Sequence, residues 1–386
     1  MANAKRRKKE QTEYYFDYTM LFIVLFLMGF GLIMIYSVSS YEAHADYGDA
    51  AYFLKKQLLS SVIGLVAMMV VANIPYPFWR RFAGLGYIVA AFLVFLVPFV
   101  GVESHGAKRW LPIPGIGLTI QPAEVAKLCM ILFLANLVCM MGSSIRKLRG
   151  MIFLIITALP MVIMVWQLTD NLSSAIIILG ISVFMIFVAS PDYKGFFVIG
   201  ALGTAGVAGL VYYISQLTMD ESMNFRFKRI LTWLNPEAYA DDTGFQTLQA
   251  LYAIGSGGVL GKGLGQSMQK LGFIPEAQND MIFSIICEEL GLFGAIAIIL
   301  MFILLLWRMM IIANNAPDLF GSLLVVGVMG HIAIQVILNI AVVTNTIPNT
   351  GISLPFISYG GTSVLFLMIE IGLVLNVAKR IQLKEI

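Results

Sequence analysis

The chain contains ten apolar stretches, each long enough to cross a lipid bilayer as a helix. A spanning helix needs about 20 largely apolar residues, because the hydrocarbon core is roughly 30 Å thick. Of the 386 residues, 59% are hydrophobic and only 12% are charged, which is too apolar for a soluble domain. The sequence therefore predicts an all-α polytopic membrane protein. The expected spans are 18–37, 57–74, 83–101, 122–141, 151–167, 173–189, 195–215, 281–307, 319–342 and 361–378.

The basic residues predict how the chain is oriented. Lys and Arg accumulate in the cytoplasmic loops of membrane proteins, so the basic run at 5–9 places the N-terminus inside, and ten spans return the C-terminus to the same side. We therefore expect a cytoplasmic segment 1–17, a membrane domain 18–378 and a cytoplasmic tail 379–386. The net charge of +3 is a topology signal, and no nucleic-acid partner is expected. The inner connections and the tail hold Arg80, Arg81, Arg146, Lys147, Arg149, Lys194, Arg308, Lys379, Arg380 and Lys384.

The longest connection, at about 216–280, is expected on the outer face between the seventh and eighth spans. It holds most of the polar and glycine-rich sequence, together with aromatic residues such as Phe227, Trp233 and Tyr252. Long loops in compact proteins are functional or disordered, and aromatic residues argue against disorder. We expect this loop to fold back onto the membrane surface and to carry function.

Ionisable residues inside the spans are candidates for function, because such groups are costly in a bilayer. Glu124 and Lys127 lie three residues apart, so they share a helix face and can form an ion pair. That pair could orient helices or contact a substrate, and the spacing supports both interpretations equally. His331 and Glu370 favour a hydrogen-bonded contact between helices. The three cysteines fall inside spans, where they act as small apolar residues rather than as redox or metal-binding groups.

Asp280 lies where the long outer loop meets the eighth span. A carboxylate there is near water but partly desolvated, so its pKa could rise to a value suited to proton abstraction. Asp before an apolar helical run is also a common N-cap. On the residues alone, the capping role is the preferred interpretation.

The glycine-rich segment at 255–265 invites comparison with a nucleotide-binding loop. Ser256 stands where the first glycine of that motif is needed, and Gly263 follows Lys262 in place of Ser or Thr. A flexible backbone that approaches a phosphate or a sugar and a plain re-entrant turn both remain open. Basic side chains in the outer loops suit an anionic lipid headgroup. They are Lys108, Arg109, Arg226, Lys228, Arg229, Lys262 and Lys270.

Nine motifs follow one another in an order that closely resembles the SEDS family (shape, elongation, division and sporulation) of peptidoglycan glycosyltransferases. The resemblance extends from Asp17 to Lys379. Each motif alone is weak, but the set is specific. The motifs are Tyr-Ser-Val-Ser-Ser at 36–40, Gly-Ala-Lys-Arg-Trp at 106–110, Gln-Pro-Ala-Glu-Val-Ala-Lys at 121–127, Arg-Ile-Leu-Thr-Trp-Leu-Asn-Pro at 229–236, Gly-Phe-Gln-Thr-Leu-Gln at 244–249, the glycine-rich segment, Pro-Glu-Ala-Gln-Asn-Asp at 275–280, Glu-Glu-Leu-Gly at 288–291, and the run from Pro348 to Gly361.

The resemblance implies that Asp280 is the catalytic aspartate, which reverses the preference for a capping role. It also implies functional roles for Glu124 and Lys127, and substrate contacts from three further motif residues, Gln246, Gln249 and Glu276. Two segments depart from the family pattern. Gln-Asn at 278–279 replaces the usual His-Thr, and Thr-Asp-Asn-Leu-Ser at 169–173 replaces Pro-Asp-x-Gly-Thr. The first and fifth motifs look more like the cell-division and sporulation branch than the rod-elongation branch.

The implied reaction joins lipid II units into a β-1,4 glycan on the outer membrane face and releases undecaprenyl diphosphate. Asp280 would be the general base, because a sugar hydroxyl is a poor nucleophile until its proton is withdrawn. The diphosphate needs positive charge, for which Arg109, Arg229 and Lys270 are the candidates. A divalent cation such as Mg²⁺ or Mn²⁺ could share this task, although no metal-binding cluster stands out in the sequence.

The family further implies binding of the undecaprenyl-linked glycan strand, a class B penicillin-binding protein transpeptidase as partner, and other divisome membrane proteins at the division septum. Three rival functions remain. A lipid II flippase would use Glu124 and Lys127 along a translocation path, and a scaffold without catalysis would tolerate Asp280→Asn. The rod-elongation paralogue of the same family is the third.

Overall fold

The computed structural model describes residues 16–104, 107–113, 119–146, 148–190, 193–217, 225–240 and 244–381. Within these ranges, ten helices are long and apolar enough to cross a membrane, which confirms the ten predicted spans. These helices are α1 (Tyr18–Tyr47), α2 (Tyr52–Asn73), α3 (Tyr76–Val100), α4 (Pro122–Met141), α5 (Leu148–Leu168), α6 (Leu172–Ala189), α7 (Tyr193–Ser215), α10 (Ile282–Asn314), α11 (Leu319–Val343) and α12 (Gly361–Ala378).

Several helices are longer than the apolar stretches that predicted them. The helix α1 ends at Tyr47, ten residues beyond the predicted end at 37, and α10 continues to Asn314. An apolar stretch measures only the crossing of the hydrocarbon core, whereas helical hydrogen bonds continue through polar residues at the interface. Arg308, which was expected in a connection, consequently lies inside α10. Its Nη2 contacts Oδ2 of Asp17, the N-cap residue of α1, at 2.6 Å.

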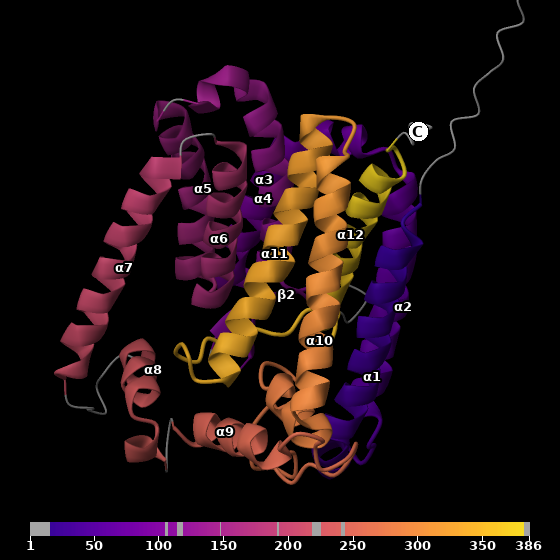
Figure 1. Ribbon diagram of the computed structural model, residues 1–386, viewed down its shortest axis with the longest axis vertical. Coiled ribbons are helices and arrows are strands. Elements are labelled where there is room, and N and C mark those ends of the chain that lie inside the picture. The colour runs from indigo at the N-terminus through magenta and orange to yellow at the C-terminus, as the bar shows by residue number, and fades with distance from the viewer. Residues whose placement is uncertain are drawn as a thin grey trace, which may run out of the picture.

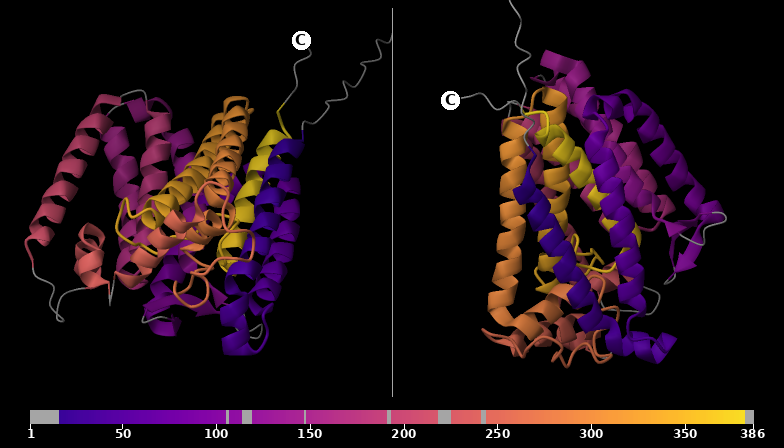
Figure 2. Two further views of the ribbon diagram at one scale, coloured as in Figure 1. Left: turned by 60° about the horizontal axis from the view of Figure 1, so that its bottom comes forward. Right: turned by 90° about the vertical axis from the view of Figure 1, so that its right-hand side faces the viewer.

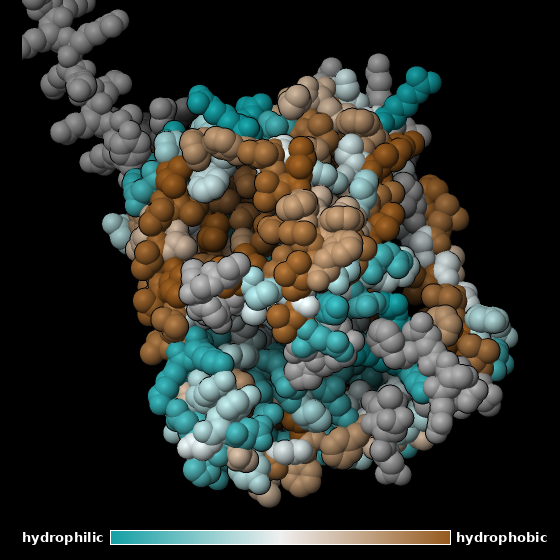
Figure 3. Space-filling model, turned by 180° about the vertical axis from the view of Figure 1, so that it is seen from behind, coloured by the Kyte–Doolittle hydropathy of each residue, from teal (hydrophilic) through white to brown (hydrophobic). Residues whose placement is uncertain are grey.

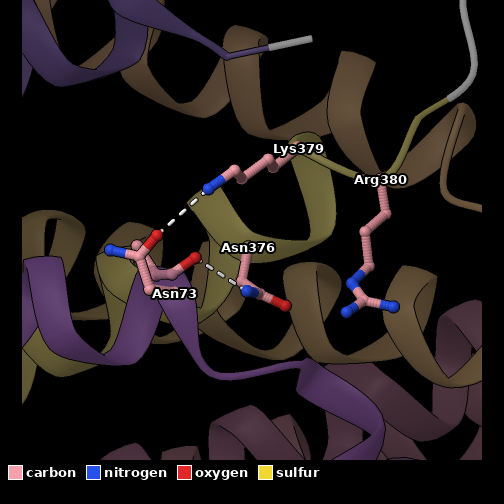
Figure 4. Close-up of a pocket in the computed structure, with 5 residues that line it drawn as sticks. Asn73, Asn376, Lys379 and Arg380 are labelled. Atoms are coloured by element: carbon pink, nitrogen blue, oxygen red, sulfur yellow. Dashed lines mark hydrogen bonds between the residues drawn. The ribbon is translucent and has the colours of Figure 1, made fainter. Parts of the chain in front are cut away.

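The two ends of the helix bundle differ. The described chain enters and leaves at one end, here called the terminal end, while α8 and α9 lie at the opposite end, here called the loop end (Figures 1 and 2). Basic residues expected inside gather at the terminal end, where Lys379 and Arg380 line a small pocket between α2 and α12 (Figure 4). The basic run at 5–9, Lys147 and Lys384 lie outside the described residues. The side of the membrane on which each end lies stays a prediction.

The core of the bundle is formed by α11 and α12. In the most apolar 18 residues of these helices, 67% and 78% of the residues are buried. In α7 the corresponding share is 6%, and this helix stands at the edge of the bundle (Figure 1). On the face seen in Figure 3, a broad hydrophobic area lies above a hydrophilic area in the lower half. This division is typical of a protein whose hydrophobic part spans a bilayer and whose loop end meets water.

The loop end contains ordered structure that follows only partly from the sequence. The long loop holds α8 (Phe225–Leu234), the short 3₁₀ helix η2 (Glu237–Tyr239) and α9 (Phe245–Gly257), followed by turns up to α10. A small antiparallel sheet between α3 and α4 was not predicted. Its strands β1 (Val102–Ser104), β2 (Ala107–Pro112) and β3 (Thr119–Ile120) pair in the order β1-β2-β3. Strands this short carry no readable alternation of polar and apolar residues.

Candidate functional site

Asp280 lies immediately before α10 at the loop end, where the chain turns from the long loop into the membrane. The N-cap residue of α10 is Met281, and no side chain caps the helix. The capping role that the residues alone favoured is therefore wrong. Asp280 is partly buried, and Arg229 of α8 interacts with it electrostatically.

The surroundings of Asp280 raise the pKa of its carboxyl group to about 6. Burial is the largest cause, because it disfavours the charged form. Glu276 raises the pKa further, whereas Arg229 and the backbone N–H groups of Asp280 and Met281 lower it. A carboxylate with a pKa near 6 is ionised at neutral pH and still basic enough to accept a proton as a bond forms.

The loop between α11 and α12, residues 344–360, forms the wall beside Asp280. A Cβ added at Gly351, where φ is +69°, would lie 3.8 Å from Oδ2 of Asp280. The backbone N–H of Tyr359 donates to the carbonyl of Gln278 at 2.9 Å. The run from Pro348 to Gly361 therefore has its place in the family pattern for a physical reason, because its backbone borders the carboxylate.

Gln246 of α9 contacts both this loop and the segment before Asp280. Gln246 donates through Nε2 to the carbonyl of Pro275 at 3.1 Å and accepts through Oε1 from Asn349 at 3.0 Å. It thus bridges the segment that precedes Asp280 and the loop between α11 and α12. Gln249 lies one turn further along α9 and is half-buried. Glu276 has a left-handed backbone with φ of +52° and accepts a hydrogen bond from Asn279.

Three arginines from β2 and α8 gather at this end of the bundle. Arg109 from β2 donates to the carbonyl of Asp170 at 2.9 Å, and Arg226 from α8 pairs with Oδ1 of the same residue at 3.2 Å. Arg229, one turn along α8, donates to the carbonyl of Asn349 at 3.3 Å and interacts electrostatically with Asp280. Asp170 lies in the turn between α5 and α6. Sequence reasoning missed the pairing of Arg226 with Asp170, because the two residues are 56 positions apart.

The predicted pair of Glu124 and Lys127 is present in α4. Nζ of Lys127 contacts Oε1 of Glu124 at 2.8 Å, and both side chains are buried. The second carboxylate oxygen of Glu124, Oε2, is buried without a hydrogen-bond partner among the described residues. No described hydrogen bond or ion pair joins this pair to Asp280. Their role in substrate binding stays a prediction.

Lys270 lies in a buried cluster with Glu289 of α10. Its Nζ contacts Oε1 of Glu289 at 2.8 Å and Oγ of Ser37 at 3.2 Å, and its side chain is 7% exposed. Glu288, beside it, pairs with Lys262 at 2.6 Å. This ionic cluster, defined by Lys262, Lys270, Glu288 and Glu289, joins the glycine-rich segment to α10. The charge of Lys270 is paired with Glu289 there, and its contact with a diphosphate stays a prediction.

The glycine-rich segment packs backbone to backbone against a break in α10 at Gly291. A Cβ at Gly261 would lie 2.2 Å from the carbonyl oxygen of Glu289, and one at Gly291 would lie 2.3 Å from the nitrogen of Gly261. The helix break frees backbone groups, and residues 258–263 hydrogen-bond to them at 2.9–3.1 Å. The segment is the re-entrant turn that was one of the two open interpretations.

The remaining candidates are distant from Asp280 or are structural. Nδ1 of His331 and Oε2 of Glu370 are 2.8 Å apart and fully buried, which confirms the expected contact between helices. Among the described residues, no group of three His, Cys, Asp or Glu side chains could hold a metal ion.

Together these residues offer a partly desolvated carboxylate that interacts with Arg229, with Arg109 and Arg226 at the same end of the bundle. Such an arrangement can withdraw a proton from a hydroxyl group and stabilise an anionic leaving group. The chemistry it suits is group transfer from a phosphorylated donor.

Comparison with known sequences identifies similar proteins over nearly the whole chain. A profile of cell cycle proteins that groups FtsW, RodA and SpoVE matches residues 18–383. Stage V sporulation protein E of Bacillus subtilis is 40% identical over 366 residues, covering 94% of this chain and 97% of that protein. A probable peptidoglycan glycosyltransferase FtsW of Trichlorobacter lovleyi is 36% identical over 370 residues, covering 95% of this chain and 94% of that protein.

Two solved structures resemble the present fold. A chain from a peptidoglycan synthase complex, solved to describe the coordination of polymerization and crosslinking, aligns with a TM-score of 0.78 at 25% identity, covering 96% of this chain and 99% of that one. The rod shape determining protein RodA of Thermus thermophilus aligns with a TM-score of 0.67 at 24% identity, covering 96% of this chain and 98% of that one. The second likeness shows the fold alone.

Proposed function

Because the chain belongs to the FtsW, RodA and SpoVE family of cell cycle proteins, we propose that it is a peptidoglycan glycosyltransferase in which Asp280 is the general base. The observation that carries this proposal is the partly buried Asp280 carboxylate at the loop end, whose pKa is raised to about 6 although Arg229 acts to lower it. Relatives named as peptidoglycan glycosyltransferases support the reaction class.

The proposed substrate is lipid II, which presents a diphosphate and a disaccharide at the outer membrane face. The 4-hydroxyl oxygen of the incoming unit attacks the anomeric carbon of the growing chain and forms a β-1,4 bond. The bond from that carbon to the diphosphate breaks, and its electron pair leaves with undecaprenyl diphosphate. The hydroxyl proton passes to Asp280. Attack opposite the leaving group inverts the anomeric centre.

Arg109 and Arg229 are the groups we assign to the diphosphate. Both lie on loop-end elements, and Arg229 interacts electrostatically with Asp280. Burial lowers the pKa of both guanidinium groups, a cost that an anionic ligand would offset. Preorganised positive charge at a developing oxyanion is commonly the largest single contribution to catalysis. A departing diphosphate then needs no protonating acid.

The proposed partner is a class B penicillin-binding protein, which would cross-link the glycan as it forms. The structural likeness to a chain of a peptidoglycan synthase complex supports an assembly of this kind. We further propose that the protein acts at the division septum, since its relatives include FtsW and the sporulation protein. Membrane location itself follows from the ten spans.

The test is a polymerisation assay with purified protein and labelled lipid II, with and without the transpeptidase, on a gel that resolves glycan chains. Wild type is compared with Asp280→Asn and with Asp49→Asn. Asp49 is a suitable control because it is a loop carboxylate paired with Lys55 on the surface. Polymer from wild type and Asp49→Asn but not from Asp280→Asn supports the proposal.

Polymer from all three proteins would remove Asp280 from the reaction. Polymer from none of them, in the presence of the partner, would favour the flippase, which a lipid II translocation assay would then detect.

A further inference from the structure

We infer that Asn339, a fully buried asparagine in α11, is a positioning residue for Asp280. This inference rests on the proposed function, since it concerns the placement of the proposed base. Nothing in the family motifs draws attention to this residue, which lies 59 positions beyond Asp280 and before the run from Pro348 to Gly361.

The contacts of Asn339 are specific. Its Nδ2 donates to the backbone carbonyl of Asp280 at 2.8 Å and to the backbone carbonyl of Ile352 at 2.7 Å. A primary amide nitrogen carries two hydrogens, so these two bonds use both of them. One side chain thereby ties the base to the loop that borders its carboxylate.

The burial of Asn339 makes these hydrogen bonds important for the local structure. Asn339 is 0% exposed, and it lies in a helix that crosses the hydrophobic part of the bundle. Burying a polar group there costs free energy unless it is hydrogen-bonded. Its Oδ1 is also buried and has no partner among the described residues. A leucine of similar size would remove the cost of burying the amide, but it would leave the carbonyl groups of Asp280 and Ile352 without this donor.

Gln335, one turn earlier in α11, contacts the same loop but not Asp280. Its Nε2 donates to the carbonyl and to Oγ of Ser353, at 3.0 and 3.3 Å. It holds the same loop, but no described hydrogen bond joins it to Asp280. Variants of the two residues therefore distinguish support of the loop, which both provide, from placement of the base, which only Asn339 would provide.

A matched control exists at the terminal end of the bundle. Asn376 of α12 is 3% exposed. It donates to the carbonyl of Ala72 at 2.7 Å and accepts from the backbone N–H of Tyr76 at 2.8 Å. Figure 4 shows its bond to α2 beside Asn73. Asn376 also joins two backbone groups from within the bundle, but on the side away from Asp280.

The experiment compares Asn339→Leu, Gln335→Leu, Asn376→Leu and Asp280→Asn as full-length proteins in the polymerisation assay with the partner transpeptidase. Initial rates are normalised to folded protein, and thermal unfolding in detergent is recorded for each. A displaced catalytic group can cost about 10²-fold in rate. We therefore expect the kcat of Asn339→Leu to fall by about 10- to 100-fold, with KM for lipid II within about twofold of wild type.

The controls are expected to behave differently. Gln335→Leu should lower kcat by less than Asn339→Leu, and Asn376→Leu should keep the kcat of wild type per folded molecule. If Asn339→Leu does not fold, Asn339→Ala replaces it. Alanine cannot donate to the two carbonyl groups and adds no bulk beside them, so the same fall in kcat is expected.

Two outcomes would overturn the inference. The first is an Asn339 variant with wild-type kcat while Asp280→Asn is inactive, since the base would then be in place without the hydrogen bonds from Asn339. The second is an equal loss in Asn339→Leu and Asn376→Leu that follows unfolding, since the loss would then be structural. Activity in Asp280→Asn would instead refute the proposed general base, a result that is independent of Asn339.

Discussion

Asp280 and Glu289 are acidic residues at the same end of α10, nine positions apart, and their surroundings differ in kind. Glu289 is fully buried, and its carboxylate contacts Lys270 and Ser37 at 2.8 Å. Asp280 is partly buried beside a loop backbone, and its pKa is raised to about 6. Glu289 is a satisfied part of the scaffold, whereas Asp280 retains basicity that a substrate hydroxyl could use.

The same end of α10 thus holds one carboxylate that stabilises the fold and one that is suited to catalysis. A buried charge that is paired and hydrogen-bonded gives little reactivity, because its lone pairs are already engaged. A carboxylate whose ionised form is disfavoured by burial keeps its basicity, and groups perturbed in this way are typical of functional sites.

The largest expected effect is on catalysis at Asp280. A positioned general base contributes about 10²- to 10⁴-fold, so Asp280→Asn should lower the polymerisation rate by that factor. Its stability should not fall at pH 8, because the neutral amide replaces a carboxylate whose ionisation is opposed by burial. Thermal unfolding in detergent checks this. A strongly destabilised Asp280→Asn protein would show that the carboxylate is part of the scaffold after all.

The next effect is on stability at Glu289. Removing one partner of a buried ion pair typically costs about 3–5 kcal/mol, because the other charge stays buried and unpaired. Glu289→Leu should be destabilised by that amount in a denaturation experiment. The double variant Glu289→Leu with Lys270→Leu should recover part of the loss. If the single and double variants unfold alike, the unpaired charge of Lys270 is not the source of the loss.

The third effect is a pH dependence of the reaction rate. The base must be ionised to accept a proton, so activity should be full above pH 7 and fall about tenfold per pH unit below the pKa of about 6. Initial rates between pH 4.5 and 8.5 measure this limb. A profile that stays level down to pH 4.5 would show that Asp280 does not act as the base.

The smallest effects are shifts, in opposite directions, of the acidic limb of the pH–rate profile, where the rate falls with decreasing pH. Arg229 lowers the pKa of Asp280 and Glu276 raises it. Arg229→Ala should therefore move the limb to higher pH, and Glu276→Gln should move it to lower pH, whatever happens to the maximal rate. Profiles that shift in the same direction would mean that another group titrates in this range.

Much of the fold could be predicted because membrane spans are local. Each of the ten helices follows from about 20 consecutive apolar residues, and all ten were expected in the right places. The small sheet was missed, since its pairs are set by contacts between short strands. The pair of Glu124 and Lys127 was also predictable, because residues three apart share a helix face.

The surroundings of Asp280 were less predictable. Family resemblance identified the residue, and the residues alone favoured a capping role that the structure does not show. Lys270 was expected at the diphosphate, but its partner Glu289 lies 19 positions away across a turn. No spacing rule in a single sequence reveals such a pairing.

The sequence by itself therefore determined the membrane architecture and the kind of reaction, because hydrophobic length and ordered motifs are written along the chain. The tertiary structure decided which charges are available and which are already paired. Lys270 is neutralised, Arg226 is held by Asp170, and Asn339 holds the backbone of Asp280. These outcomes depend on side chains that meet only after the helices pack, and burial then sets whether each charge is reactive or structural.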